Sequence, residues 1–129
     1  MLVVDTNIVV RYLTNDDAAQ AARVRRLLDQ HDVFVPLTVL LETEWVLRGV
    51  FDFPPEEVAK ALRSFAGLPR VTLEQAESAA TALEWAERGL DFADALHLTA
   101  AQAHEGFVSF DKGLARTARR LGAPPVREP

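Results

Sequence analysis

The sequence predicts an α/β domain in three layers, with a mostly parallel central sheet of four or five strands flanked by helices. Short apolar segments alternate along the 129 residues with longer stretches in which apolar residues recur at helical spacing. Strands separated by helices favour parallel pairing, because a parallel connection has to cross over the sheet. The chain contains no repeat and no low-complexity linker, and 49% of its residues are hydrophobic. We therefore expect residues 1–129 to form a single domain with its own core.

The expected strands are short and rich in branched or aromatic residues. The first, at residues 2–5, begins with Leu2, Val3 and Val4, which indicates a strand buried on both faces at the centre of the sheet. Further strands are expected at residues 33–35, 70–72, 106–110 and 125–127.

The expected helices have local start and stop signals. Asp16 and Asp17 can cap the second helix, Pro36 stands near the favoured first position of the third, and Gly89 and Gly122 suit helix C-termini. Helices are expected at residues 8–13, 18–30, 37–51, 56–68, 73–88, 91–104 and 112–121.

The composition excludes some classes of protein. The absence of cysteine rules out disulfides and thiolate metal sites, and it fits a reducing cytosol. No run of 18 apolar residues and no basic-then-apolar leader occurs, so we expect a cytoplasmic protein without a membrane span or signal peptide. The net charge is −5, from 19 acids and 14 bases. Because nucleic-acid binders are usually basic, this balance opposes one unless several acids belong to a metal site.

Two acids directly follow expected strands. Asp5 ends the first strand, and Asp111 follows the strand at 106–110, with Ser109 on the same side. In open α/β sheets ligands bind outside the carboxyl ends of the strands, so both acids are candidates for a site. Asp5 equally suits a turn in which Thr6 or Asn7 caps the next helix, and at this point both interpretations stay open.

The helix expected at 37–51 carries two acids with different surroundings. Glu44 has Arg48 four residues later, which suits a surface ion pair. Glu42 has mainly apolar helical neighbours, and a carboxylate in such surroundings needs a partner or a metal ion. The two acids lie about 200° apart around the helix and cannot share one site. Glu42 is therefore the functional candidate.

Asp91 and Asp94 lie three residues apart and share one face at a helix N-terminus. Asp91 is well explained as an N-cap, whereas Asp94 precedes apolar residues and is expected to point inward. Carboxylates gathered at such density repel one another, and a divalent cation would relieve the repulsion. Oxygen donors alone favour Mg²⁺ or Mn²⁺ over zinc. The histidines, at positions 31, 97 and 104, lack ligand spacing and are interpreted as structural.

Four segments together resemble the acidic motifs of the PIN-domain ribonucleases. In order and spacing they are similar to the small VapC toxins of bacterial and archaeal toxin–antitoxin pairs. The segments are Val3-Val4-Asp5-Thr6-Asn7, Leu40-Leu41-Glu42 with Trp45-Val46-Leu47, Asp91-Phe92-Ala93-Asp94-Ala95-Leu96, and Ser109-Phe110-Asp111-Lys112.

The resemblance implies a PIN-like sandwich and a metal-dependent endoribonuclease that leaves a 5′-phosphate and a 3′-hydroxyl. It implies Mg²⁺ or Mn²⁺ as the cofactor, in a site of one or two ions. The implied catalytic residues, which are also the implied metal ligands, are Asp5, Glu42, Asp94 and Asp111. The implied accessory residues are Asp91, Thr6, Asn7 and Ser109.

Two alternatives come from other classes. A metal-dependent phosphatase or receiver-like domain also places acids at strand ends around magnesium, but Asp5 lacks the Asp-x-Asp of the haloacid-type phosphatases. A non-catalytic binding module with the PIN fold is the second alternative. The intact set of acids opposes it, because a scaffold would gain stability by losing their repulsion.

The expected partners are RNA, an antitoxin protein and a second copy of the chain, with no membrane. Arg116, Arg119 and Arg120 share one helix face and are candidates for RNA contact, although a solvated helix end explains them as well. The resemblance implies a homodimer, with an antitoxin segment across the early helices and a basic side chain reaching the acids. A second apolar stripe on the long helix indicates an interface. The stripe consists of Leu37, Leu40, Leu41, Leu47 and Phe51.

Overall fold

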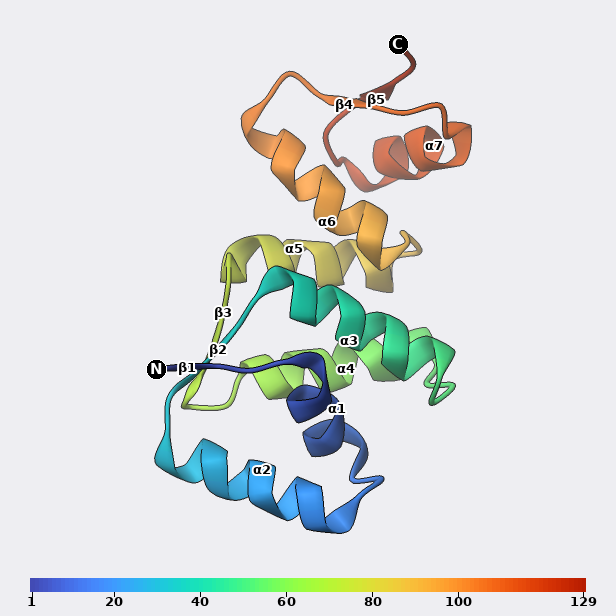
Figure 1. The fold of residues 1–129 in the computed structure, drawn as a ribbon. Coiled ribbons are helices and arrows are strands. Elements are labelled where there is room, and N and C mark those ends of the chain that lie inside the picture. The colour runs from blue at the N-terminus through green and yellow to red at the C-terminus, as the bar shows by residue number, and fades with distance from the viewer. The chain divides into compact units, whose positions relative to one another are not determined.

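The computed structural model describes residues 1–129, which divide into two compact units, residues 1–76 and 77–129 (Figure 1). Each unit is described by itself. The first unit contains β1 (Leu2–Val3), α1 (Thr6–Thr14), α2 (Ala18–Gln30), β2 (Val33–Val35), α3 (Leu37–Gly49), α4 (Pro55–Ala66) and β3 (Val71–Leu73). The second contains all but the first residue of α5 (Ala76–Glu87), then α6 (Phe92–Ala100), the 3₁₀ turn η1 (Ala101–Ala103), β4 (Phe107–Val108), α7 (Lys112–Leu121) and β5 (Val126–Arg127).

The predicted α/β fold class is confirmed. All five predicted strands form, and every strand pair is parallel. They are distributed over two sheets rather than one: a three-stranded sheet of order β1-β2-β3 in the first unit, and β4 paired with β5 in the second. Two register pairs, Leu2 with Val33 and Val33 with Val71, align the three strands of the larger sheet.

The first strand is not the centre of this sheet, contrary to expectation. The central strand is β2, and β1 is an edge on which Val3 is 70% exposed, whereas Val4 just beyond it is buried. A run of apolar residues shows that a segment favours a strand. Its place in the sheet depends on pairing partners, which lie more than 30 residues away.

The core of the first unit lies between the sheet and its helices. Val33 and Val35 of β2 cluster with Val9 of α1, Val24 of α2 and Phe65 of α4, all of which are buried. Helix α1 contacts both α2 and α3, and α3 also contacts α4. This packing holds the start of α1 and the middle of α3 in one unit.

The packed face of α3 differs from the expected one. Leu40 and Leu47, which belong to the proposed exposed stripe, are buried, and so are Thr43 and Glu44. The opposite face, with Glu42 and the 56%-exposed Trp45, is the open one. Apolar residues occur all round this helix, so periodicity alone could not show which face the unit would bury.

Side-chain caps begin four of the helices. Asp5, Asp17, Asp91 and Asp111 are the N-caps of α1, α2, α6 and α7, and each accepts a hydrogen bond from a backbone N–H three residues later. Gly122 ends α7 with a φ of 71°, which glycine adopts without strain. None of the helices is long and apolar enough to cross a membrane.

Candidate acidic site

Asp5 stands between β1 and α1 and caps the helix itself, so neither Thr6 nor Asn7 is the cap. Its Oδ1 accepts a hydrogen bond of 3.2 Å from the backbone N–H of Ile8. The bond orients the carboxylate at the positive end of the helix dipole and occupies one oxygen. The other oxygen of this exposed side chain makes no such bond, so capping and metal binding are compatible roles for Asp5.

Thr6 connects the first motif to the second. Its buried hydroxyl donates a hydrogen bond to Oε1 of Glu42, across 36 residues of sequence. The bond fixes the carboxylate of Glu42 relative to the start of α1, next to Asp5 in the chain. The first unit thus brings two motifs of the resemblance together through a side-chain contact. Nothing in the spacing of the sequence pointed to this contact.

The two acids of α3 have different structural roles. Glu42 is exposed, and its carboxylate accepts a hydrogen bond from the Thr6 hydroxyl. Glu44 accepts hydrogen bonds from Arg48, at 2.9 Å from Nε and 3.3 Å from Nη2, which confirms the expected ion pair. The expectation that this pair lies on the surface is wrong, because the Glu44 side chain is only 10% exposed. A helix face turned toward the core buries even a charged residue when an arginine compensates it.

Three carboxylates interact in the second unit. Asp91 accepts a hydrogen bond of 3.1 Å from the backbone N–H of Asp94, which confirms its role as an N-cap. Burial raises the pKa of Asp94, and repulsion from Asp91 and Asp111 raises it further, against the opposing effect of His97. Asp94 is partly buried, as expected, and the negative charges of Asp91 and Asp111 act on its carboxylate.

Asp111 repeats the arrangement of Asp5. It follows β4, caps α7, and accepts a hydrogen bond of 2.9 Å at Oδ1 from the backbone N–H of Leu114. The hydroxyl oxygen of Ser109 accepts one of 3.0 Å from the backbone N–H of Asp111. Ser109 thus shapes the turn that presents the acid.

The three arginines of α7 that were predicted to contact RNA have different surroundings. A Cβ atom added to Gly113 would meet both Asp111 Oδ1, at 3.2 Å, and Nη2 of Arg116, at 3.8 Å. Arg116 therefore lies on the same side of the α7 N-terminus as Asp111. Nη2 of Arg120 donates to the backbone carbonyl of Arg88 at 2.9 Å, so this arginine has a structural partner. RNA contact by Arg116, Arg119 and Arg120 stays a prediction.

The donor chemistry fits a divalent cation. The candidate ligands are carboxylate oxygens, hard donors that suit Mg²⁺ or Mn²⁺. In neither unit do three acids or histidines gather closely enough to hold an ion by themselves. Asp5 and Asp111 each keep an oxygen outside their cap bonds. Burial raises the pKa of Asp94 most, and a cation would relieve the further contribution from the charges of Asp91 and Asp111.

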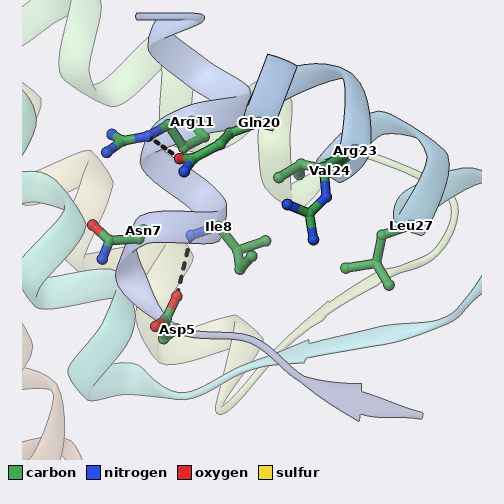
Figure 2. A pocket seen from close by; sticks show the side chains of 8 residues that line it. All are labelled: Asp5, Asn7, Ile8, Arg11, Gln20, Arg23, Val24 and Leu27. Atoms are coloured by element: carbon green, nitrogen blue, oxygen red, sulfur yellow. Dashed lines mark hydrogen bonds between the residues drawn. The ribbon is translucent and has the colours of Figure 1, made fainter. Parts of the chain in front are cut away.

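A pocket of about 470 Å³ in the first unit was not predicted. It lies between α1 and α2 and includes Asp5 and Asn7 in its lining (Figure 2). On α2 its lining residues are Gln20, Arg23, Val24 and Leu27, spaced as one helix face. The sequence signal that could have indicated this pocket is Arg23, a charged residue on the same face of α2 as Val24 and Leu27.

The fold and these side chains define a class of protein: an α/β protein with parallel strands, whose acids stand where strands end and helices begin. The chain belongs to the PIN-domain family, whose pattern matches residues 2–120. PIN domains are in general nucleases that use divalent metal ions, which supports a hydrolase acting on nucleic acid. No curated protein matches the chain.

Proposed function

We propose that this protein is an Mg²⁺- or Mn²⁺-dependent endoribonuclease and the toxin of a VapBC-type pair, acting in the cytoplasm. The observation that carries the nuclease proposal is geometric: Asp5 and Asp111 each stand between a strand and a helix with one carboxylate oxygen outside the cap bond, and the Thr6 hydroxyl holds Glu42 at the start of α1. Repulsion from Asp91 and Asp111 adds to burial in raising the pKa of Asp94, and a bound cation would offset that repulsion. The toxin assignment rests on the motif spacing within the PIN family.

In this proposal Asp5, Glu42, Asp94 and Asp111 hold the metal and carry the catalysis. A bound divalent ion lowers the pKa of a water molecule and offsets charge on the phosphate. The chain supplies orientation: the Ile8 and Leu114 N–H groups hold the two cap carboxylates, and the Thr6 hydroxyl holds Glu42. Asp91, Asn7 and Ser109 are accessory residues.

The test of the nuclease proposal compares two aspartates with the same local role. Asp5→Asn should reduce RNA cleavage in Mn²⁺ by at least about 100-fold, because it removes the charge of a ligand. Asp17→Asn should cleave within a few-fold of wild type, since Asp17 caps α2 in the same way and asparagine is an equally good cap. Asp94→Asn should be as inactive as Asp5→Asn, and EDTA should abolish wild-type cleavage.

Wild-type protein that cleaves RNA equally well in EDTA would refute metal dependence. Full activity of Asp5→Asn, in a preparation freed of other nucleases, would refute the assignment of the acid. Release of phosphate from small monoesters, without cleavage of RNA, would favour the phosphatase alternative.

We further propose an antitoxin and a second copy of the chain as partners. The homodimer now rests on the family resemblance and on the exposed Trp45 and Val50 of the α3 region, since the stripe through Leu40 and Leu47 is buried. Expression of the chain alone should arrest growth, and co-expression of a small neighbouring reading frame should restore it. Light scattering that gives a monomer at high concentration would refute the homodimer.

A further inference from the structure

The pocket between α1 and α2 combines charge with an apolar wall (Figure 2). Ile8 contributes to the wall from α1, and Val24 and Leu27 contribute from α2. Its volume of about 470 Å³ lies within the range of pockets that hold small ligands or single residues of a polymer. Asp5, a proposed catalytic acid, lines the same pocket.

Arg11 is already engaged inside this pocket. Its Nε donates a hydrogen bond of 2.8 Å to Oε1 of Gln20, shown in Figure 2, and its Nη1 pairs with Asp16 at 3.2 Å. The guanidinium is therefore held in place and its charge is compensated. The same bond occupies the oxygen of Gln20, and its amide nitrogen makes no hydrogen bond and is available as a donor.

Arg23 is the uncompensated cation of the pocket. It is exposed, and no acid of the first unit forms an ion pair with its guanidinium. Figure 2 shows Arg23 and Leu27 extending from α2 on the side that faces Ile8. A planar cation beside an apolar wall suits a ligand that offers both an anion and a flat ring.

We propose that this pocket binds one nucleotide of a single-stranded RNA, next to the bond that is cut. Arg23 contacts the phosphate, the base or ribose packs on Ile8 and Leu27, and the Gln20 amide donates to a base edge. The proposal rests on the proposed ribonuclease function and names a substrate subsite for it. Charge favours RNA over a basic peptide segment, because Arg23 would repel such a segment, whereas the charge of Arg11 is already balanced by Asp16. Asp5, which also lines the pocket, is assigned to the metal in the proposed function.

The experiment measures binding of a fluorescein-labelled twelve-nucleotide single-stranded RNA by anisotropy in EDTA, where cleavage is prevented. Arg23→Gln should weaken binding about tenfold and should reduce the salt dependence by about 0.7 in the log–log slope, the value of one phosphate contact. The affinity of Arg23→Lys should lie between those of wild type and Arg23→Gln, because lysine keeps the positive charge but lacks the planar guanidinium that binds a phosphate through two donors. Arg26→Gln is the matched control on α2, exposed and outside the pocket, and should bind within about twofold of wild type.

Cleavage in Mn²⁺ separates this inference from the function on which it rests. Arg23→Gln should raise KM and leave kcat within a few-fold, with an unchanged melting temperature. If wild type cleaves RNA while Arg23→Gln and Arg26→Gln bind it equally, the subsite is refuted and the nuclease stands. If Arg23→Gln weakens only the binding of a co-expressed antitoxin, the pocket is a protein-binding site and the proposal is overturned. If wild type does not cleave RNA, both fail.

Discussion

The two glutamates of α3 allow activity and stability to be separated with one isosteric change. Glu42 is exposed and accepts a hydrogen bond from Thr6, whereas Glu44 is buried and paired with Arg48. Glu42→Gln should reduce cleavage by at least about 100-fold, because it removes a proposed ligand charge. It should change the free energy of unfolding by less than about 0.5 kcal/mol, as expected for an exposed position. Glu44→Gln should show the reverse pattern.

The cost of Glu44→Gln follows from the geometry of its ion pair. An exposed pair four residues apart on a helix contributes about 0.3–0.5 kcal/mol, and a buried hydrogen bond to a charged group about 1.5–3 kcal/mol. The Glu44 side chain is 10% exposed but that of Arg48 is 43% exposed, so we place the loss between these limits, at about 1 kcal/mol. With an unfolding entropy of about 0.27 kcal/mol/K for a chain of this length, the melting temperature should fall by about 4 °C.

Calorimetry in EDTA and cleavage of a fluorogenic RNA in Mn²⁺ give the two measurements on the same preparations. Loss of activity in both variants, or a loss of stability confined to Glu42→Gln, would refute the assignment of the two helix faces.

Three further predictions concern the acids and their contacts. Asp94→Asn should raise the melting temperature in EDTA by about 1–2 °C, because it relieves repulsion from Asp91 and Asp111. Wild type should gain about 10 °C at a metal concentration 100-fold above Kd, and Asp94→Asn should lose most of that gain. A lower melting temperature in EDTA with a full metal response would contradict this. The pKa of Asp94 in the native state is raised from 3.8, so the native state binds this proton more tightly than the unfolded state does. The charged form of Asp94 therefore destabilises the native state fully above the native pKa and not at all below 3.8. The advantage of Asp94→Asn in EDTA should therefore shrink as the pH falls through that window, and a constant difference in melting temperature would refute the cause. Thr6→Val should lower kcat about tenfold and Thr6→Ser should restore it, because only the hydroxyl orients Glu42; equal activities of the two variants would contradict this.

Local signals predicted most of the secondary structure. The helices at residues 18–30 and 112–121 have their predicted bounds, because Asp17, Asp111 and Gly122 act within a few residues of themselves. Asp91 as an N-cap and the pairing of Glu44 with Arg48 were predictable for the same reason. The acids of the four motifs were also identifiable from sequence, and their catalytic roles stay predictions.

Tertiary structure decided what depends on distant partners. Which face of α3 is buried, and hence the burial of Glu44 beneath its ion pair, follows from packing against α1 and α4. The place of β1 at a sheet edge follows from its pairing with β2, and the bond from Thr6 to Glu42 spans 36 residues. The pocket beside Asp5 exists only because α1 and α2 pack as they do. The sequence determined caps, turns and periodicity because these act over one or two helical turns, whereas burial and pocket shape depend on the surface that another element presents.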